Sequence, residues 1–171
     1  RPRRQRTRCL PEAAEGMKPA KRLVELGIEL PPVATPAGAY VPAVRDGDLV
    51  WSSGQIPFQH GELLAVGKVG HGEGHISPEL AYDLARVAAL NAIAAIAAVA
   101  GGINKIERIV KVVGFVASDH WFTGQPGVIN GASEVLGEIF GKAGVHARSA
   151  VGVAVLPLDS PVEVEIVARV R

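Results

Sequence analysis

The chain has 171 residues, of which 48% are hydrophobic and 20% charged, and its formal net charge is +1. A chain of this length forms one domain, and its composition is that of an ordinary globule rather than a disordered segment. The small net charge argues against a dedicated nucleic-acid-binding protein. The single cysteine, Cys9, excludes an internal disulfide and a cysteine-based zinc cluster. We therefore expect a reducing, cytoplasmic location.

The start of the chain differs from the rest. Residues 1–16 are basic and lack hydrophobic periodicity, whereas residues 17–171 are regular, so we expect a basic tail followed by a single domain. Either Met17, the only methionine, is the native start and the tail is vector-derived or upstream sequence, or the tail is a genuine extension that touches nucleic acid or membrane. No apolar segment follows the arginines, so we expect no secretory signal.

The first part of the domain predicts a short helix and a hairpin. Residues 18–26 are amphipathic and are followed by Gly27, which is placed to end a helix. Three prolines then impose an extended segment. Residues 40–44 and 49–53 have strand composition and flank an Asp-Gly-Asp turn at residues 46–48, which is typical of an antiparallel hairpin.

A second turn at residues 60–62 and a glycine-rich loop at residues 67–74 lead to a long helix. Ser77 is placed to cap this helix, which should run to Ala100. It approaches a membrane span in length, but it consists mostly of alanine and is interrupted by charged and polar residues, so we predict a buried helix of a soluble protein and no membrane partner.

The second half predicts three strands and one helix. Residues 106–116 are rich in β-branched side chains and indicate a central strand, and residues 126–140 have helical spacing. Residues 149–155 and 162–170 read as two final strands. The predicted order is β-β-α-β-α-β-β, an α+β fold with two helices packed on one face of a mixed sheet.

Three sequence blocks occur in a characteristic order: Trp-Ser-Ser-Gly-Gln-Ile-Pro at residues 51–57, Val-Ile-Asn-Gly-Ala-Ser at residues 128–133, and Ala-Arg-Ser at residues 147–149, followed by Leu-Pro and Val-Glu-Val-Glu. Together they resemble the reactive intermediate deaminase family (Rid/YjgF, endoribonuclease L-PSP-like). The resemblance covers about residues 30–170. It implies a chorismate mutase-like fold and a homotrimer with active sites between subunits. The sequence contains no phosphate-binding glycine motif, Ser-His-Asp arrangement or catalytic cysteine, so we expect chemistry without a cofactor.

Two departures suggest a divergent branch of that family. Gly152 stands where many members carry glutamate, and Ala150 replaces a frequent cysteine.

Arg148 and Glu163 are the candidate catalytic residues. A guanidinium forms bidentate, charge-assisted hydrogen bonds with carboxylates, and the resemblance implies that Arg148 binds the carboxylate of a 2-imino acid. The alternative is an arginine that bridges subunits. Glu163 follows Arg148 by fifteen residues, and antiparallel pairing of the last two strands would bring Glu163 to the same site as Arg148. The resemblance implies that it positions and activates water, and Glu165 on the same strand face is a substitute. The alternative is that both carboxylates are exposed on an edge strand.

Four further residues are candidate substrate contacts. The resemblance implies that Tyr40 closes the pocket, while Ser53 and Gly54 offer a hydroxyl and an approachable backbone, and Asn130 offers an amide. For Tyr40, Ser53 and Asn130, packing in the core or an interface is an equal alternative. His71 and His75 bracket Glu73, but the intervening glycines indicate a loop rather than a helix, so we expect no metal site.

The leading functional hypothesis is cofactor-free hydrolysis of reactive 2-imino acids and enamines to 2-keto acids and ammonia. One alternative is a non-catalytic protein of the same fold that binds small carboxylates or keto acids. A second is an endoribonuclease, which the sequence favours less because the domain contains no histidine pair or basic surface pattern suited to phosphodiester cleavage.

Overall fold

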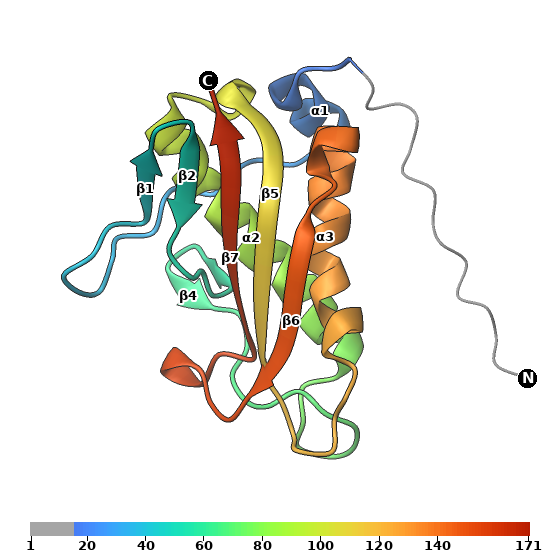
Figure 1. Cartoon of the computed structure of the whole chain (residues 1–171). Coiled ribbons are helices and arrows are strands. Elements are labelled where there is room, and N and C mark those ends of the chain that lie inside the picture. The colour runs from blue at the N-terminus through green and yellow to red at the C-terminus, as the bar shows by residue number, and fades with distance from the viewer. Residues whose placement is uncertain (1–15) are drawn as a thin grey trace, which may run out of the picture.

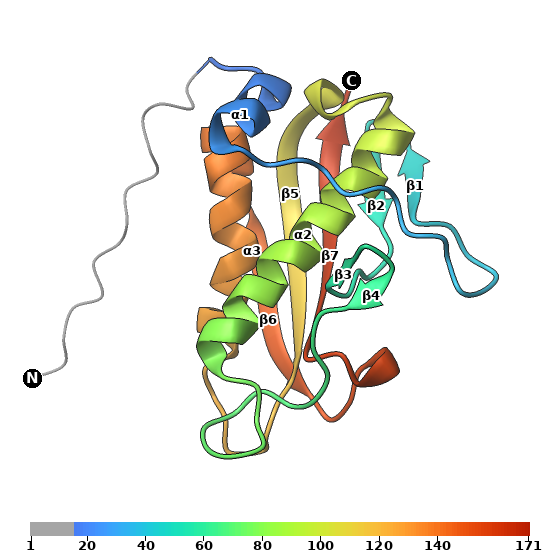
Figure 2. The same cartoon turned by 180° about the vertical axis from the view of Figure 1, so that it is seen from behind.

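The computed structural model describes residues 16–171 and forms two layers. A five-stranded sheet has the spatial order β1 (Ala43–Asp46), β2 (Leu49–Ser52), β7 (Val162–Val170), β5 (Ile106–Ala117) and β6 (Ala147–Val153). Figure 1 shows one face of this sheet uncovered, and Figure 2 shows the two long helices on the other face. The predicted α+β fold is confirmed. Cys9 and the predicted tail up to residue 15 lie outside the described residues.

The helices begin and end where their local signals predict. α1 (Pro19–Leu26) ends at Gly27, which adopts a left-handed conformation with φ 65°. α2 (Pro78–Ala100) starts at Ser77, whose Oγ accepts a hydrogen bond of 3.1 Å from the Leu80 N–H. α3 (Gln125–Phe140) follows β5 and packs beside α2.

The order of the last strands differs from the prediction. β6 and β7 are not neighbours, because β5 lies between them and pairs in parallel with β6 and antiparallel with β7. β6 also begins and ends two residues earlier than predicted, since the parallel pairing with β5 runs from Ala147 to Val153. Arg148 therefore lies within a strand rather than before one.

The first hairpin is shifted as well. Its first strand, predicted at residues 40–44, is β1 at Ala43–Asp46. Ser53 donates its N–H to the Pro42 carbonyl, but β1 starts only at Ala43, because proline has no N–H to donate to a neighbouring strand. A second, two-stranded sheet forms from β3 (Phe58–Gln59) and β4 (Glu62–Leu63), around the turn predicted after residue 59. Three short 3₁₀ segments complete the described part of the chain: Ile103–Lys105, Gly141–Gly144 and Pro157–Asp159.

α2 forms the centre of the core. Among residues 16–171 it is the single helix long and apolar enough to span a membrane, and 67% of its most apolar stretch is buried inside the protein. Its alanines allow close contact with the sheet and with α3, while Asn91 donates to the carbonyls of Ile56 and Phe58 at 3.1 and 3.0 Å. These contacts fit the prediction of a buried helix.

The contact between the two long helices leaves no space for a side chain at Gly131. A Cβ atom there would collide with the Tyr82 carbonyl oxygen of α2, whereas a Cβ at Gly127 on the same helix would meet nothing within 4 Å. We expect Gly131→Ala to lower the free energy of unfolding by about 1–3 kcal/mol through overpacking. Gly127→Ala should leave it unchanged or raise it by up to about 1 kcal/mol through helix propensity. Urea unfolding measures both, and equal effects would contradict the packing argument.

Candidate functional site

Arg148 lies on the helix-covered face of β6 and is held by α3. Its Nη1 donates to Asn130 Oδ1 at 2.8 Å and to Ser133 Oγ at 3.2 Å, and its Nη2 donates to the Pro126 carbonyl at 3.3 Å. All three acceptors are neutral, and no carboxylate within residues 16–171 forms an ion pair with this guanidinium. Burial lowers the pKa of Arg148, but an arginine remains cationic. The result is an oriented positive charge that has no negative partner among the described residues.

Two residues of this cluster were not predicted from the sequence. His146 Nε2 lies 2.9 Å from Ser133 Oγ, and its Nδ1 lies 2.6 Å from the Gly144 carbonyl. Burial lowers the pKa of His146, and the charge of Arg148 lowers it further, against the effect of the Gly144 hydrogen bond. One sequence signal was available: His146 precedes Arg148 by two residues at the start of a strand, and residues spaced in this way point to the same face.

Glu163 lies in a different place, at the edge of a cavity of about 320 Å³ formed by the extended segment before β1, the loop after β2 and the loop before β7. Tyr40 and Gly54 line the same cavity. Gly54 approaches so closely that a Cβ atom on it would collide with the Glu163 carboxylate. Three of the predicted site residues are thus brought together here.

Burial raises the pKa of Glu163, and the neighbouring Glu165 raises it further. A carboxyl with a raised pKa binds a proton more readily and is a stronger base once ionised.

Ser53 does not line the cavity. Its Oγ donates to the Val41 carbonyl at 2.6 Å. This bond fastens the segment that carries Tyr40, so Ser53 supports the cavity wall.

The two groups of candidates cannot meet within one chain. Arg148 is paired with Val112 of β5, which is buried under the helices, whereas Glu163 is paired with Phe115. Because side chains alternate along a strand, the partners of Val112 and Phe115 lie on opposite faces of the sheet. Arg148 and Asn130 therefore form one cluster on the helix side, and Glu163, Tyr40 and Gly54 form another toward the uncovered side.

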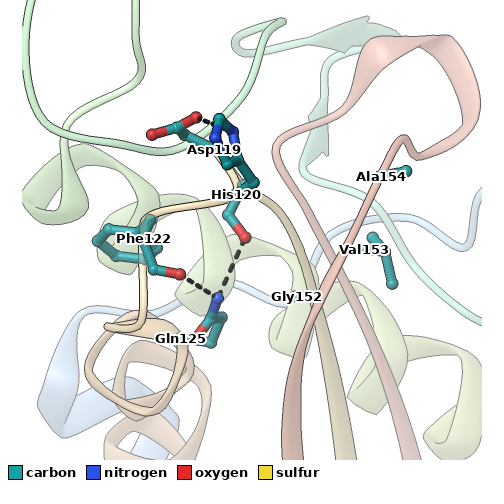
Figure 3. Close-up of a pocket in the computed structure, with 8 residues that line it drawn as sticks. Asp119, His120, Phe122, Gln125, Gly152, Val153 and Ala154 are labelled. Carbon is teal, nitrogen blue, oxygen red and sulfur yellow. Dashed lines mark hydrogen bonds and ion pairs between the residues drawn. The ribbon is translucent and has the colours of Figure 1, made fainter.

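A further pocket of about 360 Å³ lies at the carboxyl ends of β5 and β6. Figure 3 shows the Gln125 side chain pointing toward the loop that follows β5, where its Nε2 donates to Ser118 Oγ at 3.2 Å and to the Phe122 carbonyl at 2.7 Å. A Cβ on Gly152 would lie 2.8 Å from this amide nitrogen. The absence of a side chain at Gly152 thus makes room for the neutral amide. Within residues 16–171, no cluster of histidine, cysteine and carboxylate side chains is arranged to share a metal ion.

The raised pKa of Glu163 gives a direct test. We expect its carboxyl, followed by NMR, to titrate above the ordinary glutamate range and to return toward it in Glu165→Gln, because the substitution removes a repelling charge. Between the ordinary and the raised pKa the folded state binds more protons than the unfolded state, so the free energy of unfolding should fall as pH rises through this interval. Glu163→Gln should abolish that contribution, and an unchanged pH slope would contradict it.

Residues 20–170 match the family model described as "YjgF/chorismate mutase-like, putative endoribonuclease". Protein TCP17 of Trypanosoma cruzi is 38% identical over 153 residues, which cover 89% of this chain and 94% of that protein.

Solved structures of similar proteins also match this chain. A protein of Shewanella oneidensis, described as a putative endoribonuclease, has a TM-score of 0.85 and 35% identity, covering 90% of this chain and all of that one. A protein of unknown function from Agrobacterium tumefaciens has a TM-score of 0.79 and 37% identity, and the match covers 90% of this chain and 92% of that one. Escherichia coli TdcF, solved with bound serine, has a TM-score of 0.58 and 30% identity, and the match covers 83% of this chain and 94% of that one.

The sequence blocks, the sheet order and these matches lead to one conclusion: this chain belongs to the YjgF/endoribonuclease L-PSP family, also called the Rid family.

Proposed function

We propose that the protein is a homotrimeric, cofactor-free hydrolase of small 2-imino acids, with Arg148 and Glu163 contributed by different chains. The observation that carries this proposal is the charge of Arg148, which three neutral oxygens orient and no carboxylate of the described chain neutralises. A guanidinium in this state favours a carboxylate ligand, because charge-assisted bonds to it are stronger than neutral ones. The bound serine of TdcF, which carries a carboxylate next to an amino group, is a ligand of the same class.

The proposed reaction uses water and one base. Glu163 accepts a proton from water as the water oxygen adds to the C2 carbon of the imine, and it returns this proton to the imine nitrogen, which gives the carbinolamine. Glu163 then takes the hydroxyl proton of the carbinolamine and passes it to the amino nitrogen, so that the C2–N bond breaks, the C=O bond forms and ammonia leaves. The balance is R–C(=NH)–COO⁻ + H₂O → R–CO–COO⁻ + NH₃. The raised pKa of Glu163 supports this role, because a base is most effective when its pKa approaches the working pH.

The cavity also suggests which side chain the substrate carries. Apart from Glu163, its wall is formed mainly by apolar residues, including Tyr40, Ile56 and Phe58. Apolar walls with few polar groups are typical of small-molecule sites, and they favour a short apolar substituent on the imino acid.

A second copy of the chain is needed to complete this site. The helix-side cluster with Arg148 lies at an edge strand, and the Glu163 cavity opens elsewhere, so the two halves meet only across a subunit interface. The uncovered face of the sheet carries exposed apolar side chains: Val44 and Trp51 are each 53% exposed, and Val151 is 45% exposed. A patch of this kind favours association, which a closed trimer would satisfy.

The first test is hydrolysis of freshly generated 2-iminopropanoate and 2-iminobutanoate. We expect turnover by the native protein, a loss of at least about a hundredfold in kcat/KM for Arg148→Ala, and a comparable loss for Glu163→Gln. Arg148→Ala should also lose binding of 2-oxobutanoate, whereas Glu163→Gln should retain it. Binding of 2-oxobutanoate without imine turnover by the native protein would contradict the hydrolase and leave the carboxylate-binding alternative. An RNA-cleavage assay on the same preparations tests the endoribonuclease alternative.

A mixing experiment tests the shared site. Arg148→Ala chains retain an intact Glu163 half, and Glu163→Gln chains retain an intact Arg148 half. Dissociating and reassembling the two inactive variants together should restore activity at about a quarter of the interfaces if chains mix at random. Each variant reassembled with itself is the control. No recovery in mixed trimers, verified by native mass spectrometry, would show that the site is not divided in this way.

A further inference from the structure

Hydrogen bonding around Arg148 has a defined direction. The Gly144 carbonyl can only accept, so His146 Nδ1 carries a proton, and in the neutral ring Nε2 is then an acceptor. Ser133 must therefore donate its hydroxyl proton to His146 Nε2, 2.9 Å away, which leaves its oxygen free to accept from Arg148 Nη1 at 3.2 Å. The bonds run in one order, from Arg148 to Ser133, from Ser133 to His146, and from His146 to Gly144.

We propose that His146 is a positioning residue that fixes the direction of the Ser133 hydroxyl and thereby the orientation of Arg148. The role in substrate binding rests on the proposed function, but the link between the three side chains does not. A serine hydroxyl rotates freely unless a partner takes its proton. Without His146, the proton can turn toward the guanidinium, which is already rich in donors, and Arg148 then loses one of its three acceptors.

The state of the ring is consistent with this role. Burial lowers the pKa of His146, and the nearby charge of Arg148 acts in the same direction, so the neutral ring is favoured. A protonated ring would present an N–H to the serine in place of an acceptor and would place a second positive charge next to Arg148.

The same distances also describe a serine nucleophile with a histidine base and a carbonyl as the third member. The positioning role is favoured because Ser133 lies inside α3 and its oxygen already accepts a hydrogen bond from Arg148. Stoichiometric labelling of Ser133 by a fluorophosphonate probe, located by peptide mass spectrometry, would overturn the positioning role in favour of a nucleophile.

Two substitutions at His146 separate its two hydrogen bonds. In His146→Gln, the amide oxygen reaches near the position of Nε2 and accepts from Ser133. In His146→Asn, the amide nitrogen lies near the position of Nδ1 and donates to the Gly144 carbonyl. A role in positioning Arg148 requires the first bond, and a role in holding the turn at Gly144 requires the second.

The first measurement is the mobility of the Arg148 side chain in the full-length, ligand-free protein, from the relaxation of its ¹⁵Nε signal. We expect Arg148 to be ordered in the native protein and in His146→Gln, and mobile in His146→Asn and in Ser133→Ala. Mobility in His146→Gln with order in His146→Asn would overturn the proposal, and so would an ordered Arg148 in every variant. Thermal unfolding confirms that each variant is folded. The mobility measurement requires no substrate. It therefore decides whether His146 orients Arg148 through Ser133 even if the protein hydrolyses no imine.

The second measurement connects the link to binding, with 2-oxobutanoate as the probe and 2-iminobutanoate as the substrate. We expect His146→Asn to raise the Kd and KM about tenfold, the effect of losing one hydrogen bond, with kcat little changed, and His146→Gln to restore most of the loss. A fall in kcat at constant KM in His146→Asn would overturn the positioning role. If the native protein neither binds 2-oxobutanoate nor turns over 2-iminobutanoate, the proposed function fails. The mobility data still decide whether His146 orients Arg148 through Ser133.

Discussion

The placement of β5 between β6 and β7 is the constraint on which the rest of the structure depends. Its parallel pairing with β6 sets Arg148 beside Val112, under α3, and its antiparallel pairing with β7 sets Glu163 beside Phe115. A one-residue shift in either pairing would turn the corresponding side chain to the other face of the sheet. The register of this strand thus decides that the two charged groups lie apart in one chain.

This separation affects the charges of both groups. Arg148 has only neutral partners among residues 16–171, and Glu163 is buried near a second carboxylate, so each charged side chain lacks an opposite charge within the described part of the chain. Burying such groups is costly unless something compensates them. If the Arg148 half of one copy faces the Glu163 half of another, each charge reduces the electrostatic cost of burying the other. The same electrostatic imbalance supports a shared site and provides a driving force for forming it.

Local sequence signals predicted the helices well and the strand pairing poorly. Ser77 and Gly27 act on their own turns, so the helix ends that they mark could be read directly. The neighbours of β6 and β7 depend on β5, more than thirty residues earlier in the chain, and strand composition does not specify which strands pair. The candidate site was predicted residue by residue from family resemblance. The resemblance implied a site between subunits, but it did not supply the strand register, which decides that Arg148 and Glu163 lie on opposite faces of the sheet.

The contact between Ser133 and His146 was beyond prediction for a related reason. The two residues are separated by the end of α3 and by the 3₁₀ turn Gly141–Gly144, and only the shape of that turn brings the ring back over the helix. A single histidine before a strand indicates no partner by itself. Once the turn is formed, however, the Gly144 carbonyl selects the ring tautomer, and the tautomer selects the direction of the serine proton. The orientation of a charged side chain is thus determined by a backbone carbonyl in a turn. The spacing of His146 and Arg148 places the two side chains on one face, but it does not reveal this hydrogen-bonded link.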